Sequence, residues 1–156
     1  MQVIWMIVRK FKEDDAEEVS ELIRSTFMEF VAVDFTKKGI ENFLKHENPE
    51  KVNKRSKNRI ILVAVVGKKI VGVIEAKNEN RISRFFVDAS FQKRGIGTKL
   101  FKATEKICKQ RKSKVIKIYS SLDAVKFYEK MSYKKTGKVR KNRHGIVYQR
   151  MIKKFR

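Results

Sequence analysis

The hydrophobic pattern of the N-terminal third is mainly that of helices. Residues 1–9 are largely apolar and predict a first strand, and Asp14 with Glu17 three residues later marks a helix start. Apolar residues then recur at three- and four-residue steps, which predicts one apolar helix face. They are Ala16, Val19, Leu22, Ile23, Phe27 and Phe30. A second helix is expected over residues 36–45, and the polar stretch 46–59 is expected to be an exposed loop.

In the middle of the chain the pattern changes to short apolar runs that are typical of strands. Residues 60–66 and 70–76 flank a turn at Gly67, and a third run covers residues 82–87 after a second turn. Three strands joined by turns this short predict an antiparallel meander.

The C-terminal half combines helices with further strands. A glycine-bearing loop precedes a helix whose apolar face holds Leu100, Phe101, Ala103, Ile107 and Cys108. A strand at 115–119 follows, and a strand–helix–strand connection predicts that it runs parallel to the strand before the helix. A short helix over 122–131 and closing strands over 133–139 and 146–152 complete the pattern. The prediction is an α+β fold in one domain, residues 1–156, with a single mixed, largely antiparallel sheet flanked by helices on both faces.

The charge of the chain leaves two interpretations open. Lys and Arg number 39 against 17 Asp and Glu, a formal net charge of +22. Such a field favours polyanionic partners, nucleic acid among them, but scattered lysines also simply solubilise a surface. Residues 51–59 are the most basic segment, and they lack the interleaved aromatic residues that single-strand binders use for stacking.

Several function classes find no support in the sequence. The longest apolar run is far too short to span a bilayer, and the N-terminus lacks the features of a signal peptide, so we expect a cytoplasmic protein with no membrane partner. Cys108 is expected to be a buried hydrophobe and not a nucleophile. His46 and His144 have no ligand-spaced partners, so no metal site is expected.

The loop before the third predicted helix carries the clearest chemical signal. Gly95 and Gly97 remove side chains that would keep a ligand from the free N–H groups of a helix N-terminus, and Lys93 and Arg94 add positive charge there. A pyrophosphate is the natural ligand of such a loop. Neither the nucleotide P-loop nor the dinucleotide-binding motif fits, because their required Gly-Lys-Ser/Thr ending and third glycine are absent.

Two motifs together resemble a known family. Gln92-x-x-Gly95-x-Gly97, directly after a strand ending Phe-Phe-Val-Asp, resembles the acetyl-CoA motif of the GNAT superfamily of N-acetyltransferases, and the segment around Phe127-Tyr128 is similar to that family's second conserved segment. The order of strands and helices also matches over residues 3–152. Ser132 stands where the family usually has Gly, which costs about 1 kcal/mol if its φ is positive.

The resemblance implies a role for each matching residue. The strand and the loop would bind the donor, acetyl-CoA, through Phe85, Phe86, Val87, Gln92, Lys93, Arg94, Gly95, Ile96, Gly97 and Thr98, with Phe127 beside it. Tyr128 would face the thioester sulfur and protonate the departing thiolate, because a phenol has a pKa near that of an alkyl thiol. The alternative is that Phe127 and Tyr128 only pack the core.

The catalytic base is less clearly marked. Glu75 is the only carboxylate within an apolar strand of the meander, and burial would raise its pKa toward a useful value. It is equally an ordinary solvent-facing strand residue, and Asp88 is a second candidate. The family also uses water relays in place of one base. Phe27, Phe30 and Phe35 are candidates for lining an acceptor pocket.

The sequence thus predicts an acetyl-CoA-dependent N-acetyltransferase that acetylates a primary amine of a small molecule or protein by direct attack on the thioester. The alternative is a basic nucleic-acid-binding protein on the same fold with little or no transferase activity. The acceptor is not identified by the sequence, and both a monomer and a homodimer remain open.

Overall fold

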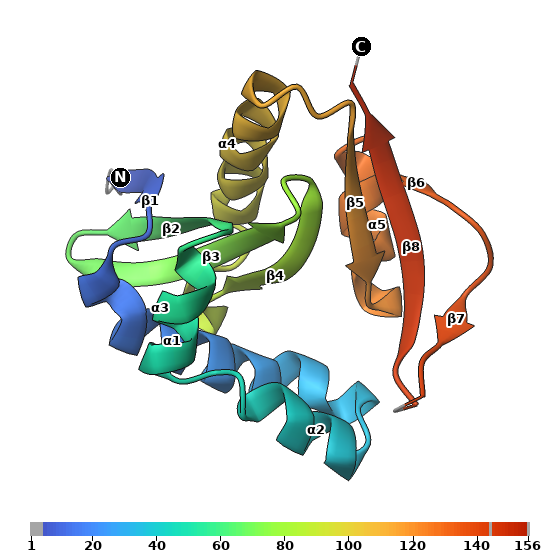
Figure 1. Cartoon of the computed structure of the whole chain (residues 1–156), viewed down its shortest axis with the longest axis horizontal. Coiled ribbons are helices and arrows are strands. Elements are labelled where there is room, and N and C mark those ends of the chain that lie inside the picture. The colour runs from blue at the N-terminus through green and yellow to red at the C-terminus, as the bar shows by residue number, and fades with distance from the viewer. Residues whose placement is uncertain (1–4, 144, 156) are drawn as a thin grey trace.

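The sheet has eight strands, and one pair of neighbouring strands is parallel whereas the others are antiparallel. The structure is a computed structural model in which residues 5–143 and 145–155 are described. The strands are β1 (Met6–Lys10), β2 (Ile60–Val66), β3 (Lys69–Lys77), β4 (Arg81–Val87), β5 (Val115–Ser120), β6 (Lys134–Lys135), β7 (Arg140–Lys141) and β8 (Val147–Lys154). Their order is β1-β2-β3-β4-β5-β8-β6, with β7 paired to β8 (Figure 1). The pairing is antiparallel throughout except between β4 and β5, as the strand–helix–strand pattern predicts.

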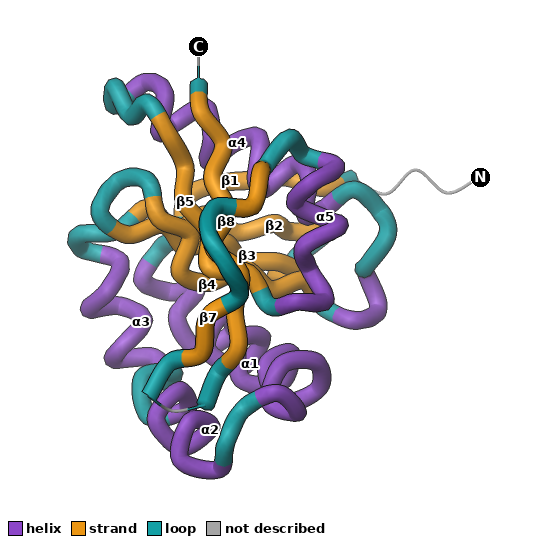
Figure 2. Tube along the Cα trace, turned by 90° about the vertical axis from the view of Figure 1, so that its right-hand side faces the viewer, coloured by secondary structure: helices purple, strands orange, loops and turns teal. Residues whose placement is uncertain are grey.

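Helices cover both faces of the sheet. The α-helices are α1 (Ala16–Thr26), α2 (Lys37–Leu44), α3 (Pro49–Ser56), α4 (Ile96–Gln110) and α5 (Val125–Lys130). Short helical turns are η1 (Glu13–Asp15), η2 (Phe27–Val31), η3 (Ala32–Asp34), η4 (Ala89–Phe91) and η5 (Leu122–Ala124). Figures 1 and 2 show α4 and α5 on one side of the sheet and α1 and α3 on the other. The predicted fold class is therefore confirmed. None of the helices in the described ranges has the length and apolarity that crossing a membrane requires.

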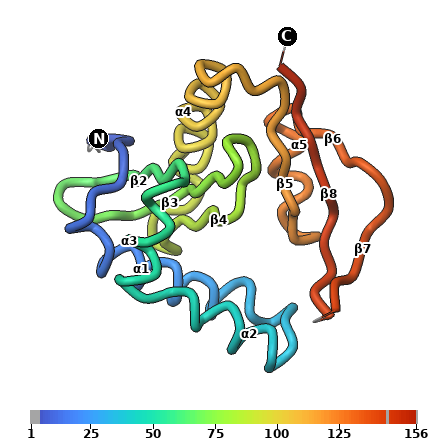
Figure 3. The backbone as a smooth tube through the Cα atoms, viewed as in Figure 1, coloured from blue at the N-terminus to red at the C-terminus, as the bar shows by residue number. Residues whose placement is uncertain are grey.

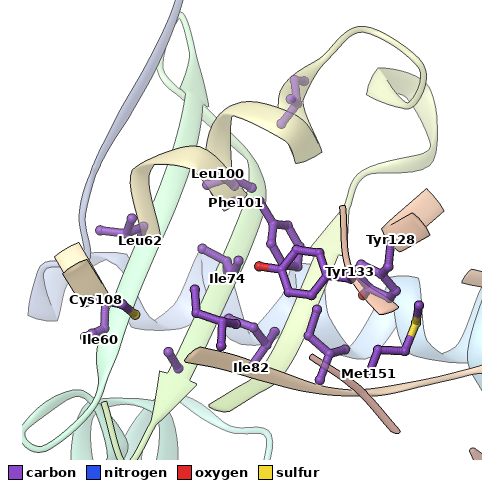
Figure 4. Close-up of a cluster of buried hydrophobic side chains, with 14 of the residues drawn as sticks. Ile60, Leu62, Ile74, Ile82, Leu100, Phe101, Cys108, Tyr128, Tyr133 and Met151 are labelled. Atoms are coloured by element: carbon purple, nitrogen blue, oxygen red, sulfur yellow. The ribbon is translucent and has the colours of Figure 1, made fainter. Parts of the chain in front are cut away.

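Two hydrophobic cores follow from the alternation of side chains along the strands. Ile60, Leu62 and Ala64 of β2 join the core beneath α4, whereas Ile61 and Val63 join the core beneath α1. Figure 4 shows Leu100, Phe101 and Cys108 of α4 against Leu62, Ile74 and Ile82 of the strands. Each such buried side chain contributes about 1.5–3 kcal/mol, so β2 to β4 form a rigid platform for α4.

The sheet opens between β4 and β5. These strands pair only at Arg81 with Lys117 and at Ile82 with Ile118. Directly afterwards the β3–β4 register shifts, which leaves Ser83 as a bulge residue. A bulge bends its strand, and beyond this one β4 and β5 separate. The edge of β4 that faces β5 is thereby left without a strand partner over residues 84–87, as the smooth trace of Figure 3 lets the reader follow.

The predicted loop over residues 46–59 is wrong, because α3 occupies most of it. Asn48 caps this helix by accepting a hydrogen bond from the backbone N–H of Lys51 at 2.9 Å, and Pro49 stands at its start. Val52 is fully buried in the core beneath α1. One buried apolar residue in a short charged helix produces too weak a periodicity to reveal it from the sequence.

Other predicted boundaries shift at both ends of the chain. The strand predicted over 133–139 is reduced to the two residues of β6, and β7 was not expected, whereas β8 agrees closely with its prediction. Residues 1–4 of the predicted first strand lie outside the described residues. The first helix ends at Thr26 and continues as the π-helical turn η2, which leaves Phe30 42% exposed and not on the predicted core face.

Candidate active site

The N-terminus of α4 is held open by a left-handed glycine. Gly95 is the N-cap residue with φ of 81°, and no atom lies within 4 Å of where its side chain would begin. The backbone N–H of Lys99 bonds the Gly95 carbonyl at 3.1 Å, so the N–H groups of residues 96–98 have no partner within the helix. Free N–H groups and the positive end of the helix dipole are the features that favour an anion at a helix N-terminus.

Gly97 has a second role that the sequence did not indicate. A Cβ at this position would lie 2.8 Å from Cζ of Phe85 and 3.3 Å from Cζ of Phe127. The rings of Phe85 and Phe127 stack with centroids 5.8 Å apart, and they come from β4 and α5. Gly97 therefore lets the start of α4 approach both aromatic residues.

A cavity of about 670 Å³ adjoins this helix start, which is the usual size for a cofactor site. Eleven of the predicted site residues line it, namely Phe85, Phe86, Val87, Gln92, Lys93, Gly95, Ile96, Gly97, Thr98, Phe127 and Tyr128. Arg94 does not line it, and its guanidinium lies over the Phe91 ring at 5.2 Å. Glu75 is also not among the lining residues. We call this space the first cavity.

A second cavity of about 420 Å³ opens in the same gap of the sheet. Phe27 and Phe35 line it as expected of an acceptor pocket, but Phe30 lines the first cavity instead. Six residues line both cavities, namely Val31, Asp34, Phe85, Phe86, Ser121 and Tyr128. Because these residues are shared, the two cavities meet between β4 and α5. We call this meeting point the junction.

Tyr128 lies at the junction of the two cavities. Its ring packs against Phe101 and Phe127 with centroids 5.5 and 5.4 Å away, and the residue is only 6% exposed. None of the hydrogen bonds within residues 5–143 and 145–155 involves its hydroxyl. Burial raises the pKa of Tyr128, so the phenol stays protonated at neutral pH and can donate a hydrogen bond.

Glu75 lies in a buried cluster of ion pairs. Its carboxylate oxygens lie 3.0 Å from Arg55 Nε, 2.9 Å from Arg59 Nη1 and 2.8 Å from Arg84 Nη1. Glu47, also fully buried, pairs with Arg55 and Arg84 in turn. The cluster ties α3 and the segment before it to β3 and β4.

The expected direction of the Glu75 pKa shift is wrong. Burial does raise the pKa of this carboxyl, but the charges of Arg84, Arg55 and Arg59 and the bond from Arg55 outweigh it, so the net pKa lies below the ordinary value. Asp88, the second candidate base, instead caps η4 by accepting a bond from the backbone N–H of Ser90 at 2.9 Å, and it lines neither cavity.

The sequence reasoning missed Asp34. This exposed carboxylate ends η3 and lines both cavities, so it faces the junction together with Tyr128. The available signal was a single acid at the end of the apolar stretch 30–33. It was overlooked because a short 3₁₀ turn has no periodicity that would assign the residue to a face.

Comparisons with known proteins agree with this geometry. The family model described as "Acetyltransferase (GNAT) domain" matches residues 31–155. Searching curated protein sequences gave no match. A GCN5-related N-acetyltransferase from Rhodopseudomonas palustris is similar at TM-score 0.84 and 19% identity, covering 99% of each chain.

Two further solved structures extend the similarity. The PaiA N-acetyltransferase of Thermoplasma acidophilum, solved in complex with coenzyme A, has TM-score 0.83 and 20% identity over 97% of this chain and 99% of its own. An aminoglycoside 6'-acetyltransferase type Ii has TM-score 0.73 and 26% identity over 95% of this chain and 96% of its own. The fold, the helix N-terminus at the first cavity and the family model agree, and the chain therefore belongs to the GNAT family of acetyltransferases, enzymes whose acetyl donor is acetyl-CoA.

Proposed function

We propose that this protein transfers the acetyl group of acetyl-CoA to a primary amine of a small molecule, with the donor in the first cavity and the amine in the second. The observation that carries the proposal is the junction: two cavities of suitable size share Tyr128 and Phe86 in the gap between β4 and β5. Two reactants that enter separately and must bring one pair of atoms together require such an arrangement.

The donor would be held by backbone groups more than by side chains. The pyrophosphate would accept hydrogen bonds from the N–H groups of residues 96–98, with the Lys93 ammonium adding charge at the same end of the cavity. The pantetheine arm, which carries amide groups, would lie along the free edge of β4 at residues 84–87 and pair with it as an added strand does. Phe85 and Phe127 would pack against the arm near the thioester.

The chemical step is then direct attack. A neutral amine nitrogen forms a bond to the thioester carbon, the C–S bond breaks, and the nitrogen loses a proton while the sulfur gains one. Tyr128 is the proposed donor of the hydrogen bond to the departing thiolate, because the residue lies at the junction and its hydroxyl is protonated and has no other partner within the described ranges. Its raised pKa makes full proton transfer less favourable than for an ordinary phenol, so hydrogen bonding to the sulfur is its main contribution.

Glu75 is proposed to act structurally and not as the base. A carboxylate that already accepts bonds from three arginines and has a lowered pKa is a poor proton acceptor, and it lines neither cavity. The amine proton would leave instead through water at the junction, where Asp34 is exposed.

No observation favours the nucleic-acid alternative. The basic segment considered for it folds largely as α3, and Arg55 and Arg59 of this region are paired with buried carboxylates and are not free to bind phosphates.

The test is calorimetric titration with acetyl-CoA of two matched glycine variants. Gly95 and Gly67 both have positive φ, 81° and 63°, and both have open space beside them, so Ala costs each about 1 kcal/mol of stability. Gly95→Ala strains the loop whose N–H groups would hold the pyrophosphate and is expected to weaken binding about tenfold, which corresponds to about 1.4 kcal/mol. Gly67→Ala strains the β2–β3 turn and is expected to leave binding unchanged. Equal affinity in both variants would contradict the assignment of the loop.

A further inference from the structure

Eight of the nineteen residues that line the second cavity are aromatic. Rings come from both halves of the molecule, and they are Phe27, Phe35, Phe43, Phe85, Phe86, Tyr119, Tyr128 and Tyr148. Phe27 and Phe43 stack at 3.9 Å between centroids, and Tyr119 and Tyr148 stack at 5.1 Å. A cavity of this kind suits a flat, apolar body of modest size.

One guanidinium in this cavity has no anionic partner. Arg81, at the start of β4, lies over the Tyr119 ring with Cζ at 3.9 Å from the centroid. No carboxylate in the described part of the chain pairs with it, whereas the neighbouring Arg84 is paired with both Glu47 and Glu75. A half-buried guanidinium that is fixed by stacking and lacks a counter-ion is a ready acceptor for a carboxylate, which it can bind through two parallel hydrogen bonds.

The surroundings of Arg81 are electropositive. The ion-pair cluster, from which Arg84 lines the second cavity, sets three arginines, Arg55, Arg59 and Arg84, against two carboxylates. The pKa of the nearby Lys77 ammonium is lowered. Burial is the largest cause, and the charges of Arg81, Arg59 and Arg84 lower the pKa further. An anion at this end of the cavity is therefore favoured, and a cation is repelled.

At the junction the cavity carries a negative charge instead. Asp34 is the one acidic residue among those that line the second cavity, and its carboxylate has no ion pair or hydrogen bond with any other described residue. Asp34 shares the junction with Phe85, and Arg81 stands four residues earlier on β4, about 13 Å along the strand. The cavity thus has a negative end beside the thioester site and a positive end remote from it.

We propose that the acceptor is a primary amine that carries a carboxylate at the far end of an aromatic body. Its ammonium is received by Asp34 before it loses a proton, its ring lies among the phenylalanines and tyrosines, and its carboxylate pairs with Arg81. This inference rests on the proposed function. Polycationic amines are poor acceptors, because the cavity offers them a single carboxylate and a net positive wall.

The experiment uses two probes of nearly the same shape, 4-(2-aminoethyl)benzoate, which carries the carboxylate, and 4-(2-aminoethyl)benzamide, in which a neutral carboxamide replaces it. Their binding to the protein saturated with coenzyme A is measured by calorimetry, and their acetylation by release of the free thiol from acetyl-CoA. The wild-type protein is expected to prefer the benzoate about tenfold in Kd, since hydrogen bonds between charged groups are among the strongest. Spermidine, the polycationic probe, is expected to bind more weakly than the benzoate.

Three variants locate the effect. Arg81→Gln is expected to abolish the preference for the benzoate while leaving the benzamide unaffected. Asp34→Asn is expected to weaken the binding of both probes to the same extent, because both carry the ammonium group. Lys102→Gln removes one positive charge from the exposed face of α4, outside both cavities, and is expected to keep the preference.

Equal binding of both probes to the wild-type protein would overturn the inference, and so would a preference for the benzoate that survives Arg81→Gln. Tighter binding of spermidine than of the benzoate would do the same. If the benzamide is acetylated as fast as the benzoate, the inference about the acceptor is wrong, but the proposed acetyltransferase function is still supported. A failure to bind acetyl-CoA would instead remove the proposed function itself.

Discussion

Two buried tyrosines, five positions apart in the chain, have opposite relations to their surroundings. Tyr128 and Tyr133 lie with ring centroids 6.1 Å apart, and burial raises the pKa of both. The Tyr133 hydroxyl donates a hydrogen bond to Glu105 at 2.9 Å, and Glu105 also pairs with Lys153. Tyr128 lines both cavities, and its hydroxyl has no such partner among the described residues.

Buried polar groups with a structural role differ from those with a chemical role in whether their hydrogen bonds are already made. A buried group whose hydrogen bonds are all made stabilises the fold, and its removal leaves a partner unsatisfied. A buried group that opens on a cavity keeps its capacity for a ligand. By the same criterion Glu75, which is paired with three arginines, has a structural role like that of Tyr133 and unlike that of Tyr128.

The largest expected effect is that of Tyr128→Phe on turnover. Removal of the Tyr128 hydroxyl, the proposed hydrogen-bond donor to the departing sulfur, is expected to lower kcat about 10²-fold, with acetyl-CoA affinity and Tm little changed. Steady-state kinetics and calorimetry on the same preparation provide the measurement. An unchanged kcat would make Tyr128 a packing residue like its neighbour.

Glu75→Gln is expected to act on stability instead. Loss of the carboxylate charge leaves the buried arginines undercompensated and lowers the free energy of unfolding by about 3–5 kcal/mol. The folded-state pKa of Glu75 is below its unfolded value, so its stabilisation is fully present above pH 4.5 and is lost as the pH falls through the lower folded pKa.

Denaturant unfolding of both proteins across this pH range checks the prediction. The difference in free energy of unfolding between the wild type and Glu75→Gln is expected to be constant near neutral pH and to become smaller in acid. A shift in the pH dependence of kcat, with stability unaltered, would restore Glu75 as the base.

Tyr133→Phe tests whether the Tyr133 hydroxyl contributes to stability and not to turnover. The variant removes the hydrogen bond to Glu105 but leaves the pairing of Glu105 with Lys153 at 3.0 Å, so a loss of about 1–3 kcal/mol in unfolding free energy is expected. Turnover measured well below Tm is expected to match the wild type. A loss of kcat as large as that of Tyr128→Phe would remove the distinction between the two tyrosines.

The smallest expected effect concerns the turn that separates these tyrosines. Ser132 has φ of 72°, which confirms the strain expected for a non-glycine residue after α5. Ser132→Gly is expected to stabilise the protein by up to about 1 kcal/mol and to leave kcat unchanged. Thermal unfolding measures the change, and a lower Tm would mean that the serine side chain contributes contacts that outweigh the strain.

Local sequence determined much of the architecture. The meander of β2 to β4, the helix α4 behind its glycine loop and the pair Phe127-Tyr128 were all predicted, because each depends on periodicity or on a contiguous motif. The identification of the family followed from the same contiguous residues.

The tertiary structure alone decided which of these residues face the chemistry. The bulge at Ser83 and the two-residue pairing of β4 with β5 open the sheet, and no local pattern encodes them. The pKa of Glu75 is set by Arg55, Arg59 and Arg84, which come from other parts of the chain, so burial alone predicted the wrong direction. Electrostatic and cavity properties depend on neighbours through space, whereas the sequence orders residues only along the chain.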